Sequence, residues 1–344
     1  MNISFDVSPL TNNNKNRGIG KYTQNLLKEL KKAENITITE FSQGYSIPPC
    51  DLVHYPYFDP FFLTLPIIKK YPTIVTIHDL IPLIFPKKFP KGLKGEIKWL
   101  IQKTSLKSVK AVITDSQASK KDIVKYTGFN PEHIYVVYLA PMLTDISINP
   151  EEINDLKNKY HLPNKFLLYI GDINYNKNVP NLYEAINILN SSMSLVLIGN
   201  SFLNISLSEK KQLDQLAKNL NIESRLLKLG GLTDKEIKAI YQLATAYIQP
   251  SLYEGFGLPV IEALSLGCPV VCSRGGSLPE VAGEAVIYID PHRPQNISEG
   301  IERVLRLDDI SRQEFLVKGK AQASKFSWTN TVNRTIDVYN RLAH

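Results

Sequence analysis

The sequence predicts an α/β protein made of two doubly wound domains. Short, continuous apolar runs rich in β-branched residues alternate along the 344-residue chain with longer segments of helical periodicity. Continuous apolar runs are typical of parallel strands covered on both faces, and their alternation with helices is typical of doubly wound sheets. A polar, proline-punctuated stretch over 140–163 interrupts the pattern, so we expect a domain boundary there.

The first domain is expected to span 1–148. The first strand is the apolar start of the chain, and most later strands end where a proline or polar residue begins a turn. Asp115 and Ser116 precede the third helix, and we expect Ser116 to cap its N-terminus with Ser119 nearby. The expected strands are 3–7, 36–41, 52–55, 73–77, 111–114 and 135–138, and the expected helices lie near 19–33, 94–109 and 117–127.

The second domain is expected to span 149–326 and to repeat the same alternation. The expected strands are 166–170, 195–198, 226–229, 246–249, 270–272 and 286–289, and the expected helices lie near 178–190, 207–220, 233–243, 257–266, 297–307 and 311–323. A last helix near 328–342, in the segment 327–344, carries Trp328, Val332, Ile336 and Tyr339 at helical spacing. Such a stripe favours a packing face over a functional one.

The composition is that of a globular protein, with 43% hydrophobic and 21% charged residues. No window of about 18 apolar residues predicts a membrane span, and the N-terminus lacks the basic start of a signal peptide. Cys50, Cys268 and Cys272 have no metal-ligand spacing, and an odd count favours reduced thiols in a cytoplasmic protein. We therefore expect no metal and no cofactor.

The net charge of +7 lies wholly in the first domain. Residues 1–150 carry 19 Lys and Arg against 12 Asp and Glu, whereas 151–344 carry 21 of each. The stretch 86–110 has eight lysines and one glutamate, together with Trp99 and Leu100. It is either an ordinary solvated helix face or a basic amphipathic segment on an anionic membrane, and the lysine density favours the membrane. Basic and aromatic residues do not interleave as in nucleic-acid-binding segments, so no nucleic acid is expected.

The stretch 251–271 carries the main functional pattern. Glu254 and Glu262 stand eight residues apart, in the order strand, glycine-rich turn, helix and strand. Glycines let main-chain N–H groups approach a ligand, and a helix start favours a phosphate. Carboxylates beside that anion site would accept hydrogen bonds from hydroxyls. The pattern therefore predicts a ligand with both phosphates and sugar hydroxyls, such as a nucleotide sugar.

The string E-G-F-G-L-P-V-I-E-A, from Glu254 to Ala263, resembles the signature of retaining glycosyltransferases of the GT-B fold, family 4. The resemblance implies two Rossmann-like domains facing across a cleft, with the last helix packing back on the first domain. It also implies a nucleotide diphosphate sugar donor, with Glu254 on the sugar hydroxyls and Glu262 on the ribose. The donor-binding loop would comprise Gly255, Phe256, Gly257 and Leu258.

Lys177 lies in a loop that resembles the diphosphate-binding loop of the same family, usually G-R-x4-K. Gly171 and Lys177 match that pattern, but Asp172 stands at the arginine position. The missing cation could be replaced by Arg274 or Arg17, and the sequence leaves this choice open. Lys177 is expected to stabilise the charge of the leaving diphosphate.

Two further elements of the first domain resemble the family. Gly18 and Gly20 follow the first strand and open a helix, like the glycine loop near the donor phosphates. His78 lies in T-I-H-D-L-I-P, a form resembling mannosyltransferase-like members, and is expected to contact the donor sugar. His54 ends the preceding strand, and there we favour a core histidine satisfied by its neighbours.

The resemblance implies a retaining glycosyltransferase, with His78, Lys177 and Glu254 as its catalytic residues. The forms H-D-L-I-P and S-L-P-E-V, the latter at 277–281, favour mannose from GDP-mannose. The acceptor would be a polysaccharide or a lipid-linked oligosaccharide at the inner face of the cell membrane. Two alternatives stay open, namely a nucleotide-sugar epimerase of the same fold and a non-catalytic nucleotide-sugar-binding subunit, the latter because of Asp172.

Overall fold

The computed structural model describes residues 1–12, 14–15 and 17–342. The chain divides into two compact units: unit 1 is Met1–Ala140 together with Phe326–His344, and unit 2 is Pro141–Lys325. The domain boundary expected after residue 148 therefore lies later than the unit boundary, because residues 141–148 belong to unit 2. The last two residues of the expected segment 327–344 lie outside the described residues.

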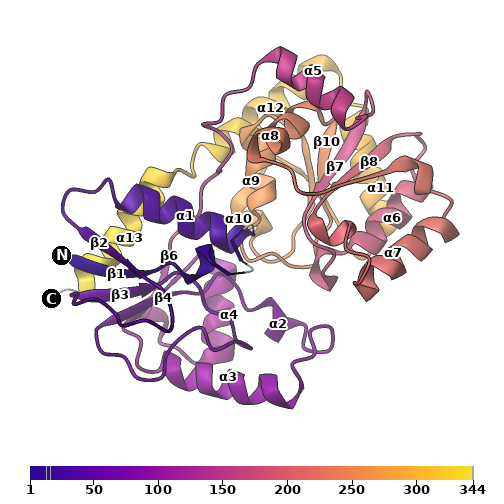
Figure 1. Ribbon diagram of the computed structural model, residues 1–344. Coiled ribbons are helices and arrows are strands. Elements are labelled where there is room, and N and C mark those ends of the chain that lie inside the picture. Colours follow the sequence, from indigo (N-terminus) through magenta and orange to yellow (C-terminus); the bar gives the residue numbers. More distant parts are fainter. Residues whose placement is uncertain (13, 16, 343–344) are drawn as a thin grey trace. The chain divides into compact units, whose positions relative to one another are not determined.

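Unit 1 is built on a six-stranded parallel sheet in the order β2-β1-β3-β4-β5-β6 (Figure 1). The chain runs outward from β1 to β2 and then crosses to β3 on the other side of β1, so a topological switch point lies between β1 and β3. The strands are β1 Asn2–Asp6, β2 Thr37–Phe41, β3 Leu52–Tyr55, β4 Thr73–Thr76, β5 Ala111–Thr114 and β6 Ile134–Val136.

Helices follow β1, β4 and β5, as expected for parallel connections, whereas the described chain has no helix between β2 and β3 or between β3 and β4. Ser116 caps α4 as predicted, because its side chain accepts a hydrogen bond from the Ser119 N–H, and Gly128 ends the helix in the left-handed conformation. The short helix α2 is not expected from the sequence. The helices of unit 1 are α1 Gly18–Leu30, α2 Ile81–Ile84, α3 Gly92–Leu106, α4 Gln117–Thr127 and α13 Trp328–Leu342.

The C-terminal helix α13 completes unit 1 by packing against α1. Val332, Ile336 and Tyr339 are buried, as the helical spacing predicts. The hydroxyl of Tyr339 also forms a 2.6 Å hydrogen bond with Nδ1 of His54 on β3. The last helix is therefore joined to the centre of the first sheet.

Unit 2 repeats the plan with a six-stranded parallel sheet in the order β12-β11-β10-β7-β8-β9. Its strands are β7 Phe166–Ile170, β8 Ser194–Ile198, β9 Leu226–Leu229, β10 Ala246–Gln249, β11 Val270–Ser273 and β12 Ile287–Ile289. The chain runs from β7 through β8 to β9 and then returns to β10 beside β7. The switch point therefore lies between β7 and β10, where ligands of such sheets bind.

Eight helices are described in unit 2, two of which the sequence analysis did not foresee. Helix α5 starts at Pro150 with a capping box between Asn149 and Glu152, and α10 is a short turn of helix after β11. The helices are α5 Pro150–Lys159, α6 Val179–Ile188, α7 Ser208–Asn219, α8 Asp234–Leu243, α9 Leu258–Ser265, α10 Leu278–Ala282, α11 Pro294–Leu305 and α12 Asp309–Ala323.

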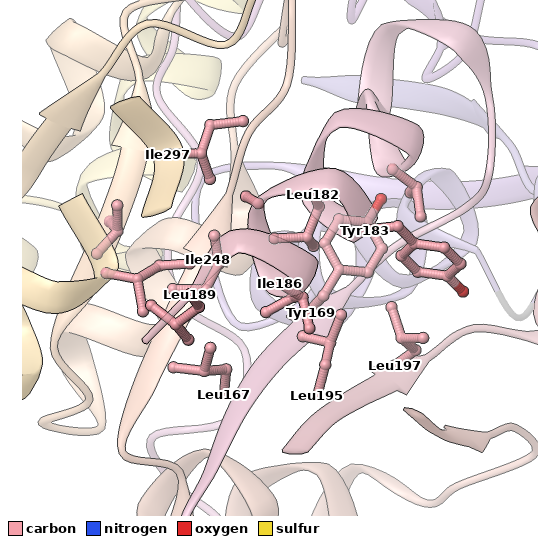
Figure 2. Packing of buried hydrophobic residues seen from close by; sticks show 14 of the residues in the cluster. Leu167, Tyr169, Leu182, Tyr183, Ile186, Leu189, Leu195, Leu197, Ile248 and Ile297 are labelled. Atoms are coloured by element: carbon pink, nitrogen blue, oxygen red, sulfur yellow. The ribbon is translucent and has the colours of Figure 1, made fainter. Parts of the chain in front are cut away.

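The core of unit 2 lies between the central strands and the helices α6 and α11. Figure 2 shows Leu167 and Leu195 of neighbouring strands below Leu182 and Ile186 of α6, with Ile297 of α11 beside them. All five side chains are buried, and burial of each contributes about 1.5–3 kcal/mol. This rigid layer supports the loops that leave β7 and β10. Among the described residues, no helix is long and apolar enough to cross a membrane.

Candidate active site

The loops after β7 and β10 are joined to each other at the switch point of unit 2. Asn176 donates from its side-chain Nδ2 to the carbonyl of Tyr253, and its main-chain carbonyl accepts from the Leu252 N–H. Asn178 takes the left-handed conformation, with a φ of 58°, and its Nδ2 donates to the carbonyls of Pro250 and Pro291. Asparagine tolerates this conformation better than most residues. These contacts hold Lys177, which lies between the two asparagines, against the loop after β10.

Lys177 and Glu254 form an ion pair in this position. Lys177 Nζ lies 2.8 Å from Oε1 and 3.0 Å from Oε2 of Glu254. Oε1 also accepts from Gln249 Nε2 at 2.7 Å and from Ser251 Oγ at 2.6 Å. Glu254 is buried, so its charge is kept in the protein interior by one cation and two neutral donors. The sequence analysis did not select Gln249 or Ser251, although polar residues at the end of an apolar strand are a signal for such a role.

The glycine-rich turn around Glu254 is shaped by the neighbouring S-L-P-E element. Ser277 donates from its N–H to the Glu254 carbonyl and from Oγ to the Phe256 carbonyl. Gly276 has a φ of 63°, and a Cβ there would overlap the carbonyl oxygen of Glu254. Gly257, with a φ of 101°, precedes the first residue of α9, Leu258. Positions 257 and 276 therefore favour glycine because their φ angles are positive. Position 276 also favours it because the Glu254 carbonyl leaves no room for a Cβ.

Glu262 lies on α9 and binds the start of unit 2. Its Oε1 accepts from the Met142 N–H at 2.6 Å, and its Oε2 from the Leu143 N–H at 3.3 Å. Lys238 of α8 donates to the carbonyls of Thr144 and Ile146 in the same segment. Glu262 and Lys238 therefore hold 142–146, which follows the unit boundary directly. The sequence predicts a ribose contact for Glu262, and nothing in its local pattern indicates the hydrogen bonds to 142–146.

The arginine position of the diphosphate loop is Asp172, whose carbonyl accepts from the Tyr169 hydroxyl at 2.8 Å. Gly171 follows the last residue of β7, and a Cβ there would lie 2.9 Å from the Tyr169 hydroxyl oxygen. Arg274 is exposed and its guanidinium lies over the Tyr288 ring, 3.8 Å from the ring centre. Such stacking is a favourable cation–π contact. Arg17 lies in unit 1, immediately before α1.

In unit 1, His78 follows β4 and pairs with Asp115, which follows β5. His78 Nδ1 lies 2.6 Å from Asp115 Oδ2, and the His78 ring meets the Tyr22 ring edge to face at 4.7 Å between centres. Burial alone lowers the pKa of His78, but the charge and hydrogen bond of Asp115, helped by Asp79, outweigh it and raise this pKa above 6.5. Among the described residues, no group meets His78 Nε2 at full hydrogen-bond geometry, although the Pro56 carbonyl lies near enough to the ring to help raise this pKa. Asp115, which we predicted only as part of a helix cap, therefore orients a candidate site residue.

Tyr22 and Thr76 connect His78 to a buried histidine. Thr76 Oγ1 lies 3.2 Å from the Tyr22 hydroxyl and 2.8 Å from His54 Nε2, while His54 Nδ1 meets the Tyr339 hydroxyl. Burial, reinforced by the charge of His78, lowers the pKa of His54 to about 3, so this imidazole is neutral at physiological pH. The structure thus shows His54 as the satisfied core histidine that the sequence favours.

The glycines at the start of α1 allow close packing. Gly18 is the first residue of the helix. A Cβ at Gly20 would overlap the carbonyls of Asn14 and Lys15, and the Gly20 N–H donates to the Asn14 carbonyl at 3.2 Å. Gly20 therefore holds the preceding loop against α1. The described part of the chain contains no group of three or more His, Cys, Asp or Glu side chains arranged to hold a metal ion.

Two doubly wound parallel sheets in separate units are the architecture of the GT-B class of glycosyltransferases. Solved structures of that class share the fold. Sucrose-phosphate synthase from Thermosynechococcus elongatus matches with a TM-score of 0.77 and 17% identity, covering 99% of each chain. The Anabaena protein Alr3699/HepE, solved with UDP and glucose, matches with a TM-score of 0.75 and 16% identity over 99% of this chain and 100% of its own.

The chain belongs to the family of glycosyl transferases group 1, which it matches over residues 150–322, and residues 45–140 match Glycosyltransferase Family 4. The O-antigen chain mannosyltransferase B of Escherichia coli is 34% identical over 272 residues, covering 78% of this chain and 70% of that protein. The serotype-specific mannosyltransferase WbdA of Escherichia coli is 30% identical over 279 residues, and there the match spans only 33% of the relative's length. The protein is a glycosyltransferase.

Proposed function

We propose that this glycosyltransferase moves mannose from GDP-mannose, with retention of anomeric configuration, to a polysaccharide or lipid-linked oligosaccharide. The observation that carries the proposal is the Lys177–Glu254 ion pair at the switch point of unit 2, with Gln249 and Ser251 on the same carboxylate. It combines a cation for a diphosphate with an acceptor for sugar hydroxyls. Both relatives described above are named as mannosyltransferases, which favours mannose.

Lys177 stabilises the charge that develops on the leaving diphosphate. The turn from Gly255 to Leu258 adds main-chain N–H groups at the start of α9, where a helix favours an anion. Arg274 or Arg17 supplies the positive charge that the family pattern places at position 172, where this chain has an aspartate. Removal of one preorganised donor of this kind from an active site lowers kcat by about 10²- to 10³-fold.

Glu254 orients the sugar and Glu262 the ribose. Each carboxylate oxygen has two lone-pair sites. Oε1 of Glu254 already accepts from Lys177, Gln249 and Ser251, so the sugar hydroxyl binds at Oε2, which accepts only from Lys177 among the described residues. Gln249 and Ser251 hold the Glu254 carboxylate in one orientation, which preorganises it for the donor. Glu262 keeps its bonds to Met142 and Leu143 while it binds the ribose.

Transfer takes place on one face of the sugar. The bond between the anomeric carbon and the phosphate oxygen breaks, and the bond between that carbon and the acceptor oxygen forms on the same face. The acceptor proton passes to the departing phosphate oxygen. His78 donates a hydrogen bond from Nε2 to a sugar hydroxyl, for which its raised pKa and its bond to Asp115 prepare it.

The acceptor is a growing polysaccharide or a lipid-linked oligosaccharide, and the protein works at the inner face of the cell membrane. The relative named as an O-antigen chain mannosyltransferase supports such an acceptor. The excess of lysine in 86–110 supports a place beside anionic lipid.

A thermal-shift panel of nucleotide sugars followed by product analysis tests the proposal. GDP-mannose is expected to raise the melting temperature of the full chain, and Glu254→Gln is expected to reduce that shift. The anomeric configuration of the product is then read by NMR. An inverted product would refute retention, and a larger shift with a UDP-sugar would refute the donor. A shift without turnover over a broad acceptor panel would favour the non-catalytic subunit.

A further inference from the structure

A chain of hydrogen-bonded polar side chains runs through the interior of unit 1 from α13 to the ring beside His78. The Tyr339 hydroxyl lies 2.6 Å from His54 Nδ1, and His54 Nε2 lies 2.8 Å from Thr76 Oγ1. Thr76 Oγ1 lies 3.2 Å from the Tyr22 hydroxyl. These four residues, which we call the Thr76 network, come from α13, β3, β4 and α1 and are brought together only by the fold.

The members of the Thr76 network are buried completely. Tyr339, His54 and Thr76 are 0% exposed and Tyr22 is 2% exposed. Apolar side chains of similar volume would fill the same space without any polar group to satisfy. A buried network in which each polar group finds a partner makes its members rigid, because every bond fixes the orientation of two side chains. The hydrogen bonds therefore add orientation to the packing of this region.

The bonds of the network depend on one another through His54. A neutral imidazole donates from one ring nitrogen and accepts at the other, and this ring is neutral because its pKa is lowered to about 3. When Nε2 accepts, the single proton of the Thr76 hydroxyl is used there, so the Tyr22 hydroxyl must donate to Thr76. When Nε2 donates, Thr76 can donate to Tyr22. The side chains thus orient as one unit.

The Tyr22 ring carries this orientation to His78. The two rings meet edge to face, with 4.7 Å between centres and 88° between planes. On its other side His78 is bound at Nδ1 by Asp115 at 2.6 Å. The ring torsion of a histidine is broad, so one hydrogen bond alone leaves the ring free to tilt. The Tyr22 ring, held at its hydroxyl by Thr76, limits that tilt and fixes the direction in which Nε2 points.

We propose that Thr76, His54 and Tyr339 are positioning residues for His78, and that they act through the Tyr22 ring. They hold Nε2 in the direction of the sugar hydroxyl, and Tyr339 makes helix α13 part of the site through a residue buried in the core. This role rests on the proposed contact of His78 with the donor sugar. It adds residues that take no part in the proposed transfer itself.

Two exchanges of Thr76 separate positioning from packing. Valine keeps the shape of the side chain and lacks the hydroxyl, whereas serine keeps the hydroxyl and lacks a methyl group. In calorimetry with the full chain, Thr76→Val is expected to weaken binding of GDP-mannose about fivefold, and Thr76→Ser about twofold at most. Binding of GDP, which has no sugar for His78 to contact, is expected to stay unchanged in both. A packing role predicts the opposite order, with serine worse than valine.

Nuclear magnetic resonance of ¹⁵N-labelled histidine rings reports on His78 directly and without any donor. The chain has six histidines, and the spectrum of His78→Asn assigns the His78 signals. Thr76→Val is expected to shift the ring signals of both His54 and His78. Tyr339→Phe, a second variant at the far end of the network, is expected to shift the same two rings and to weaken binding of GDP-mannose but not of GDP.

Tyr160→Phe in unit 2 is the control, because it also loses one tyrosine hydrogen bond, to Glu236 at 2.8 Å. It is expected to leave the His78 signals and both affinities unchanged, and circular dichroism checks that every variant is folded. Unchanged His78 signals in Thr76→Val would overturn the proposal, as would a weaker affinity for GDP-mannose in Thr76→Ser than in Thr76→Val. If the His78 signals move but His78→Asn binds GDP-mannose like the wild type, the positioning is confirmed and the proposed sugar contact is refuted.

Discussion

Lys177 and Glu254 are 77 residues apart in the sequence, yet Lys177 Nζ lies 2.8 Å from Glu254 Oε1. They meet because β7 and β10 are neighbours in the sheet, so the loops that follow them begin side by side. The cation and the carboxylate thus stand at the one place in unit 2 where the strand order reverses.

Exchange of Lys177 for Met is expected to lower kcat/KM by about 10²- to 10³-fold, because the charge on the leaving diphosphate then lacks its cation. The same exchange leaves Glu254 buried with only neutral donors, which lowers the free energy of unfolding by about 1–3 kcal/mol. Steady-state kinetics and urea unfolding measure the two effects. The double variant with Glu254→Gln should lose less stability than the sum of the losses of the two single variants, since the two residues interact directly. Additive losses would contradict the pairing.

Asp115→Asn is expected to destabilise the protein in a pH-dependent way. The pKa of His78 in the folded protein is raised above 6.5, so protonated His78 stabilises the fold below about pH 6.5, and this contribution is lost as pH rises through the raised value. Unfolding free energies of wild type and variant should differ by about 1–3 kcal/mol near pH 6 and converge toward pH 9. A difference independent of pH would contradict the ion pair.

Gly276→Ala is expected to disrupt the Glu254 turn, whereas Gly231→Ala serves as its control. Both glycines have positive φ, 63° and 68°, but only at Gly276 would a Cβ overlap the Glu254 carbonyl. The control should lose about 1–2 kcal/mol of stability from its conformation alone and keep its activity. Gly276→Ala should lose more stability and most of its activity. Similar losses at both positions, measured by thermal unfolding and turnover, would argue against the close approach.

Comparing Glu262→Gln with Lys238→Met separates two roles of Glu262. Each exchange removes hydrogen bonds to the segment 142–146, and each is expected to cost about 1–3 kcal/mol of stability. Only Glu262→Gln should weaken donor binding in calorimetry, because only Glu262 is proposed to hold the ribose. Equal affinity of the two variants for the donor would contradict the ribose contact and leave Glu262 with only its hydrogen bonds to Met142 and Leu143.

Much of the fold is readable from local pattern. The expected strands 166–170 and 246–249 coincide with β7 and β10, because short, nearly continuous apolar runs between turn signals are typical of buried parallel strands. Helix α5 is not expected from the sequence, although Asn149, Pro150 and Glu152 form a recognisable start signal, because such a polar stretch is also typical of a linker. The hydrogen bonds of Glu262 and Lys238 to the segment 142–146 join residues far apart in the chain, so no local pattern indicates them.

The alternation of strands and helices and the glycine-rich turn after Glu254 follow from the amino-acid sequence alone, because backbone propensity and glycine placement act between near neighbours. Which side chains meet depends on the tertiary structure. Strand order brings Lys177 to Glu254 and His78 to Asp115. Such contacts follow from the order of strands in a sheet, and that order cannot be read from local pattern.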